Sequence, residues 1–211
     1  MYKDKKGFTI IELMIATSVF AVVLVVAATG ILTIGRLYYK GVTSSRTQEA
    51  TRSVINTIAS TIQFTGNNRS DDGETDVAGT AQAICFGYDR YTYVINSQVS
   101  NGDRGLVYDR RPDLHDCSAL ESGGTELLPE NTRLLAFNID AINTKTFRIG
   151  VKVAYGANDL LSTYDDNGNP IGGSGHPNIT EAADAQCKPG IAGSNFCAVS
   201  ELETTVSKRV E

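Results

Sequence analysis

The sequence has little of what catalysis or metal binding usually requires. Its two histidines, His115 and His176, do not have the spacing of metal ligands, and no C-x-x-C pair occurs. The patterns of a serine-hydrolase nucleophile, a zinc protease and a phosphate-binding loop are also missing. We therefore expect a protein that is not an enzyme and that has no organic cofactor.

The chain also lacks the basic excess that is typical of nucleic-acid-binding proteins. Its 211 residues have a net charge of −5, and 41% of them are hydrophobic, which is ordinary for a globular protein. Residues 36–211 contain 16 basic and 22 acidic side chains. Nucleic acid is therefore not an expected partner, and about 150 residues are enough for one domain with a real core.

Charge is almost absent from residues 8–35. A leader with three lysines ends at Gly7, and the only charge in the next 28 residues is Glu12. As a helix this run is about 42 Å long, enough to cross a bilayer with some tilt. A charged carboxylate near the centre of a bilayer costs about 2.5–3.5 kcal/mol, which makes Glu12 a candidate functional residue. A signal peptide or plain signal anchor is the alternative, but it leaves Glu12 unexplained.

The helix is expected to continue beyond the apolar run. Residues 36–65 contain no proline, and their apolar side chains recur at helical spacing. We predict one helix from Phe8 to Thr65, ended by Gly66-Asn67-Asn68. The apolar stripe of its second half is expected to consist of Leu37, Val54, Ile55, Ile58, Ala59 and Ile62.

Period-two alternation predicts strands in the rest of the chain. It is clearest over Thr146–Tyr155, where large apolar side chains alternate with polar or small ones. Weaker strand patterns occupy Ala83–Tyr88, Tyr91–Asn96, Gly105–Arg110, Arg133–Ile139 and Cys197–Val206. The predicted fold is α+β, a long N-terminal helix packed on an antiparallel β-sheet.

The four cysteines, Cys85, Cys117, Cys187 and Cys197, all follow the apolar run, which favours an exported domain with disulfides. Three pairings are formally open. The simplest joins Cys85 to Cys117 and Cys187 to Cys197, because each pair is then local. A cytoplasmic domain with four free thiols is the alternative.

One loop has the side chains of a calcium site. Asp165, Asn167 and Asn169 place oxygen atoms at alternate positions, as calcium-binding loops do. However, Pro170 stands where an EF-hand needs glycine, and no glutamate follows at the required distance. A turn with solvated acidic side chains is the favoured alternative.

The segment Gly7-Phe8-Thr9-Ile10-Ile11-Glu12-Leu13 resembles the processing site of type IV pilins and pseudopilins. The resemblance implies that a prepilin peptidase cuts between Gly7 and Phe8 and methylates the new N-terminus. It also implies that Glu12 pairs with the terminal amine of a neighbouring subunit. The pilin-like helix and sheet predicted above agree with this family, although many type IV pilins have a proline within the apolar half and this chain has none there.

The resemblance divides the chain into a leader (residues 1–7), a transmembrane helix half (8–35), an amphipathic half (36–66) and a β-rich domain (67–211) with a long loop at 156–196. It implies a structural subunit of a type IV pilus or related filament. The long loop and the four cysteines resemble a minor pilin or pseudopilin more than an abundant shaft subunit. The closing segment, residues 196–206, is similar to the last strand of minor pilins of the W type and pseudopilins of the J type. That similarity implies a subunit that primes assembly and sits at the tip. A tip adhesin, or a pseudopilin of type II secretion or DNA uptake, is the alternative.

The same resemblance implies the partners and the location. The partners are a prepilin peptidase, other pilins, an inner-membrane assembly platform and the membrane itself through residues 8–35. The chain is expected to span the inner membrane once with its N-terminus in the cytoplasm. It then moves into a filament at the cell surface.

Overall fold

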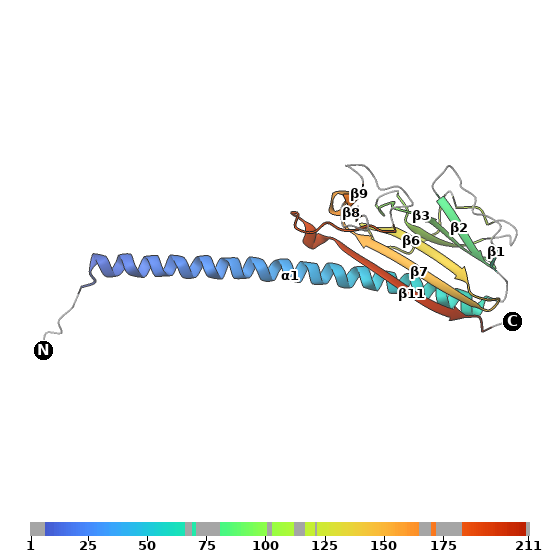
Figure 1. The fold of residues 1–211 in the computed structure, drawn as a ribbon, viewed down its shortest axis with the longest axis horizontal. Helices are drawn as coiled ribbons and strands as arrows, with labels where there is room; N and C mark the ends of the chain where they lie inside the picture. The colour runs from blue at the N-terminus through green and yellow to red at the C-terminus, as the bar shows by residue number, and fades with distance from the viewer. Residues whose placement is uncertain are drawn as a thin grey trace. The chain divides into compact units, whose positions relative to one another are not determined.

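The computed structural model describes most of the chain in two compact units, Met1–Tyr39 and Lys40–Glu211. One helix, α1 (Ile10–Phe64), runs through both of them (Figure 1). The described residues are 7–65, 69–70, 81–100, 103–111, 117–120, 122–164, 170–171 and 183–209.

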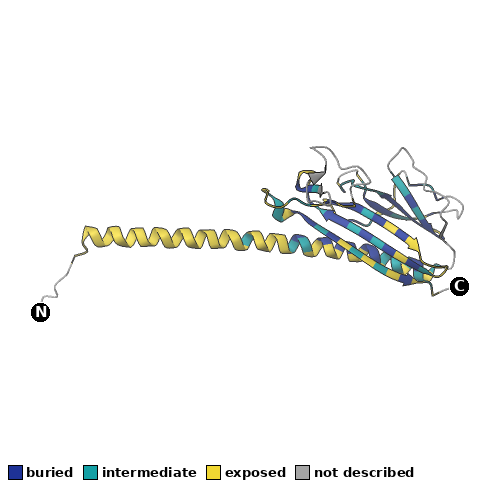
Figure 2. Cartoon of the chain, viewed as in Figure 1, coloured by how far each residue is buried: buried dark blue, intermediate teal, exposed yellow. Residues whose placement is uncertain are grey.

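The N-terminal unit consists of the apolar part of α1. Its described side chains are exposed almost throughout, as the yellow helix in Figure 2 shows. Among the described residues, α1 is the one helix that is long and apolar enough to cross a membrane. The unit is therefore suited to be a membrane anchor, because apolar side chains that no protein covers are stable in lipid.

The C-terminal unit packs the rest of α1 against a three-stranded antiparallel sheet. The strand order of this sheet is β11 (Ala198–Ser207), β7 (Thr146–Tyr155) and β6 (Thr132–Ala141). The strand predicted at Thr146–Tyr155 has the predicted bounds, and the α+β fold is confirmed. Alternate side chains of β7 (Phe147, Ile149, Val151 and Val153) are buried in the main core.

A second, five-stranded antiparallel sheet follows the helix in the sequence, with its strands in chain order. The strands are β1 (Arg69–Ser70), β2 (Ala81–Phe86), β3 (Asp89–Val94), β4 (Leu106–Arg110) and β5 (Thr125–Glu126). Phe86, Tyr91 and Leu106 of this sheet are fully buried in the same core as the helix. The core therefore joins both sheets and the C-terminal part of α1.

Residues 156–196, which we expected to form one long loop, contain short elements in their described part. A small sheet has the strand order β10 (Gln186–Cys187), β8 (Leu161–Tyr164), β9 (Pro170–Ile171). Two single-turn helices, η1 (Asn158–Leu160) and η2 (Ser194–Phe196), lie beside it in the sequence. Pairings of two residues leave no periodic pattern in a sequence, so only turn signals were visible there.

The buried stripe of α1 differs from the predicted one at its N-terminal end. Val54, Ile55, Ile58 and Ile62 are buried as predicted, whereas Leu37 is 66% exposed, so the prediction is wrong for Leu37. Three threonines, Thr43, Thr47 and Thr51, continue the stripe instead. The hydroxyls of Thr47 and Thr51 each donate to the carbonyl four residues earlier, at 2.8 Å, which satisfies them inside the helix.

Candidate functional site

The first candidate site is the peptide between Gly7 and Phe8. It precedes α1 and lies outside any regular element. The Phe8 side chain is 76% exposed, and a Cβ atom placed on Gly7 would meet nothing within 4 Å. A protease therefore meets an uncovered peptide at this point.

Glu12 lies in the first turn of α1, where it forms a reciprocal capping box with Thr9. Its carboxylate accepts hydrogen bonds from the Thr9 backbone N–H at 2.9 Å and from the Thr9 hydroxyl at 2.8 Å. The Thr9 Oγ1 in turn accepts the Glu12 backbone N–H at 3.3 Å. These bonds satisfy N–H groups that a helix start leaves without partners, and a negative charge there suits the helix dipole.

The capping box gives Glu12 a structural role that our sequence interpretation missed. The signal was present as the spacing Thr9-x-x-Glu12 before an apolar run. Because a carboxylate offers about four lone-pair sites, the two bonds to Thr9 leave it able to accept from a cation as well. Capping by Glu12 and pairing with an amine are therefore compatible.

The four cysteines form two disulfides, Cys85–Cys117 and Cys187–Cys197. This is the pairing that the sequence analysis gave as the simplest of the three possibilities. The first bond connects β2 to residue 117 and is buried among Ala81, Ala83 and Ala119. The second connects β10 to the residue before β11 and lies in a separate small core with Leu160 and Leu161. The first disulfide therefore fixes Cys117, which belongs to no strand, and the second fixes the two-residue strand β10.

The calcium prediction falls on residues that lie outside the described part of the chain. This is so for Asp165, Asn167 and Asn169. It is also so for His115 and His176. Among the residues that are described, no group of three or more His, Cys, Asp or Glu side chains could hold a metal ion. A calcium site at 165–169 stays a prediction.

The tyrosines of β3 do not form a ligand-binding surface. Tyr91 and Tyr93 are buried in the main core, and the Tyr91 hydroxyl lies 2.7 Å from the Thr61 hydroxyl of α1. Tyr88, in the turn before β3, is exposed, and the Arg110 guanidinium lies over its ring at 5.8 Å. An adhesin that stacks ligands on these three rings is therefore not supported.

A buried arginine was also missed by the sequence interpretation. Arg133 of β6 is 1% exposed, and burial lowers its pKa. Its guanidinium donates to the side-chain oxygens of Gln98, at 2.9 Å, and Asn158, and to the Gly156 carbonyl at 3.1 Å. Its Nε has no hydrogen-bond partner among the described residues. Arg133 thus connects three separate stretches of the chain through neutral acceptors.

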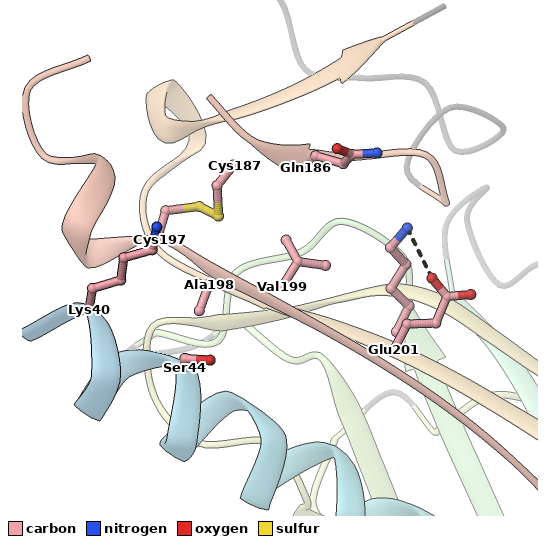
Figure 3. Close-up of a pocket in the computed structure, with 9 residues that line it drawn as sticks. Lys40, Ser44, Gln186, Cys187, Cys197, Ala198, Val199 and Glu201 are labelled. Atoms are coloured by element: carbon pink, nitrogen blue, oxygen red, sulfur yellow. Dashed lines mark ion pairs between the residues drawn. A yellow bond between two sulfur atoms is a disulfide. The ribbon is translucent and has the colours of Figure 1, made fainter. Parts of the chain in front are cut away.

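One open pocket of about 480 Å³ lies in the C-terminal unit (Figure 3). It is lined by Lys40 and Ser44 of α1, Lys152 of β7, Gln186, the Cys187–Cys197 disulfide, and Ala198, Val199 and Glu201 of β11. The Lys152 ammonium is paired with the Glu201 carboxylate at 3.3 Å. The pocket therefore marks the place where the start of this unit's helix meets the second disulfide.

Residues 2–28 match the model of the prokaryotic N-terminal methylation motif. The peptide between Gly7 and Phe8, the Glu12 side chain and the apolar run as far as Ala28 all lie inside the matched range. The chain thus has the N-terminus of a type IV pilin-like prepilin. The comparisons with curated proteins and with solved structures gave no match for the chain.

Proposed function

We propose that this chain is a structural subunit of a type IV pilus or a related filament, made as a prepilin. The supporting observation is the methylation motif at residues 2–28, which overlaps the start of a long apolar helix. In this proposal a prepilin peptidase removes residues 1–7 and methylates the amine of Phe8. The subunit then packs through its apolar helix against other pilins.

The proposed topology follows from charge and from the cysteines. Lys3, Lys5 and Lys6 precede the apolar run and favour a cytoplasmic N-terminus by the positive-inside rule. The C-terminal unit is then outside the cytoplasm, where disulfides persist. Both disulfides lie in that unit, which agrees with this orientation. From there the subunit would enter the filament through an assembly platform in the inner membrane.

Glu12 is proposed to set how the apolar helices of neighbouring subunits are aligned along one another. Its carboxylate lies four residues after the new N-terminal amine of Phe8. A negative charge in hydrocarbon is stable only beside a positive one, and the methylated amine of a neighbouring subunit supplies that charge. A role in starting assembly or at the tip is the finer form of this proposal, supported by the four cysteines and the long segment 156–196.

The intact mass of the protein purified from its native membrane tests the proposal. We expect the mass of residues 8–211 with both disulfides and one added methyl group. Gly7→Val is the matched control, because a bulky residue before the cut should leave the full-length mass. A full-length mass for the unchanged protein would identify a plain signal anchor, and a cut near Ala28 would identify a secreted protein.

A further inference from the structure

Strand β11 forms one edge of the three-stranded sheet β11–β7–β6 (Figure 1). Its ten residues pair with β7 without a shift of register, from Ala198 opposite Tyr155 to Ser207 opposite Thr146. A strand at an edge bonds to a neighbour on one side only, so every second residue directs its backbone N–H and C=O away from the sheet. A long, straight edge is therefore a place where another strand can pair.

Backbone hydrogen bonds just beyond β11 show which of its residues face outward. The Lys208 N–H donates to the Lys145 carbonyl at 2.8 Å and so continues the ladder with β7. The Arg209 N–H leaves the ladder and donates to the Gln63 carbonyl of α1 at 3.0 Å. Because the two directions alternate along an antiparallel strand, even-numbered residues of β11 bond to β7 and odd-numbered residues face outward. The outward residues are Val199, Glu201, Glu203, Thr205 and Ser207.

The outward side of these five residues, which we call the open edge, has no backbone partner. Among the residues that the structure describes, none forms a hydrogen bond with the outward N–H or C=O groups of the open edge. All five residues are exposed except Val199, which is partly buried. The open edge is about 27 Å long at about 3.4 Å per residue, and it ends at Arg209, where α1 supplies a carbonyl.

The opposite edge of the same sheet, at β6, is protected where it begins. The N–H groups of Asn96 and Val99 donate to the carbonyls of Leu134 and Thr132, at 2.7 and 2.8 Å. The register of β6 with β7 also shifts between Leu134 and Ala136. Covering segments and bulges keep natural edges from pairing with other chains. Strand β11 contains no proline and no register shift, so the fold protects one edge and leaves the other available.

Two glutamates on β11 determine which strand fits the open edge. Glu201 and Glu203 have side chains that are 70% and 61% exposed, and they pair with Lys152 at 3.3 Å and Arg148 at 3.1 Å. If two copies of β11 paired antiparallel over the whole open edge, Glu203 of one copy would lie opposite Glu203 of the other. Like charges directly opposite each other are destabilising, whereas lysine or arginine opposite these glutamates is favourable.

We propose that β11 pairs antiparallel with an extended segment of a partner protein that has lysine or arginine at alternate positions. The segment adds a strand to the sheet, held by main-chain hydrogen bonds and selected by the two glutamates. The contact lies wholly within the C-terminal unit Lys40–Glu211, so it goes beyond the filament function and does not require residues 8–35 to span a membrane. The intact mass tests the filament proposal alone, so the failure of one proposal leaves the other in place.

A synthetic ten-residue peptide in which lysine alternates with threonine is the probe. Its binding to the full-length chain in detergent is measured by the anisotropy of a fluorescent label. A second peptide has the same sequence with a methyl group on the backbone nitrogen of each lysine, which retains the charge and removes the donors. We expect the unmethylated peptide to bind at least about tenfold more tightly, because several hydrogen bonds are lost on methylation. Equal binding of the two peptides would mean that the attraction is only electrostatic, and the proposal would be wrong.

Thr205→Pro is the variant that blocks the open edge. Proline removes the outward N–H and is tolerated at an edge strand whose N–H faces solvent, so β7 pairing should persist. We expect it to weaken binding of the unmethylated peptide at least about fivefold, whereas Thr205→Val, which keeps the N–H, should bind it normally. Glu201→Gln/Glu203→Gln leaves the backbone intact and should weaken binding about threefold to tenfold. Thermal unfolding checks that each variant is folded, and normal binding by the folded variants would contradict the proposal.

Amide hydrogen exchange shows directly whether the open edge is used. In the free protein the amides of the outward residues should exchange faster than those of their even-numbered neighbours, and bound peptide should slow them at least about tenfold. Outward amides that are already protected in a monomer would mean that another part of the chain covers the edge. Protection that rises with protein concentration would identify a second copy as the occupant. Either result would overturn the proposal.

Discussion

At the scale of single residues, Glu12 has a helix-capping role in the structure and a proposed charge-pairing role. Glutamine can replace glutamate in a capping box, because its side-chain oxygen still accepts from the N-cap backbone. Glu12→Gln therefore removes the charge and retains the cap, whereas Glu12→Ala removes both. The pair of variants separates the two roles.

We expect Glu12→Gln to lower incorporation into filaments by more than about tenfold, because breaking a buried charge pair costs about 3–5 kcal/mol. Thr9→Val is the control that weakens the cap and leaves the charge, and it should cost about 1 kcal/mol of helix stability with near-normal incorporation. Filament yield and the membrane level of each variant are the measurements. Normal incorporation of Glu12→Gln would show that Glu12 acts only as a cap.

Two tyrosines make the stability of the C-terminal unit sensitive to alkaline pH. Burial raises the pKa of Tyr91 far above its ordinary value near 10. The hydrogen bond that Tyr108 donates to Asp89, at 2.6 Å, raises the pKa of Tyr108. Since the folded state favours the protonated phenols, their contribution is complete below about pH 10 and is lost as pH rises above it.

We therefore expect the unfolding temperature to fall progressively as the pH rises above about 10. Tyr91→Phe should cost about 0.5–1.5 kcal/mol at neutral pH, because the bond to Thr61 is lost, and should make the fall shallower. Tyr88→Phe, at an exposed tyrosine, should leave the profile as it is. Equal slopes for the Tyr91→Phe and unchanged proteins would contradict the assignment.

At the scale of elements, long periodic segments were predictable and short ones were not. Helix α1 was predicted from Phe8 to Thr65 and runs from Ile10 to Phe64, because an apolar run without proline allows few alternatives. Strand β7 was predicted at its full length from strict alternation. The two-residue strand β10 pairs with β8 through Gln186 and Ser162, which are far apart in the sequence, so this pairing was not predictable.

Buried polar side chains that meet partners from distant segments were also not predicted. Arginine is seldom buried without a charged partner, so Arg133 in a strand pattern is expected to face solvent. Instead it is buried with the neutral oxygens of Gln98, Gly156 and Asn158. No spacing rule in the sequence brings these residues together, because their proximity depends on the packing of three segments. The same reasoning applies to the contact between Thr61 and Tyr91.

The two disulfides are expected to differ in their contribution to stability. They join residues separated by 32 and 10 positions. The chain-entropy relation gives about 3.7 kcal/mol for the longer loop and about 2.7 kcal/mol for the shorter one. Cys85→Ser/Cys117→Ser should therefore lower the free energy of unfolding by about 1 kcal/mol more than Cys187→Ser/Cys197→Ser. Denaturant unfolding measures both, and the reverse order would show that native contacts of residues 187–197 dominate.

At the scale of the whole molecule, helix α1 has exposed side chains in its first part and buried core side chains in its second part. The part within Met1–Tyr39 has its described apolar side chains exposed, whereas the part after Lys40 supplies buried residues to the core of the C-terminal unit. The globular unit therefore cannot be defined by the β-rich residues alone. The part of the chain that folds as one unit begins at Lys40, within α1.

This boundary predicts how shortened chains behave. Residues 40–211 should fold cooperatively without the membrane part, because they contain all the described core residues. Residues 66–211 lack Val54, Ile55, Ile58 and Ile62, whose burial is worth about 1.5–3 kcal/mol each, together comparable with the 5–15 kcal/mol that stabilises a typical domain. We expect this shorter chain to be unfolded or aggregated.

Circular dichroism and thermal unfolding of the two shortened chains measure this difference. A chain of residues 40–211 with Ile58→Asp is the matched control, because it keeps the length and places a charge at a fully buried core position of α1. It should behave like residues 66–211, since an unpaired buried charge costs several kcal/mol. Cooperative folding of residues 66–211 would mean that the two sheets form a sufficient core by themselves. The helix would then be held by the domain without being needed for its folding.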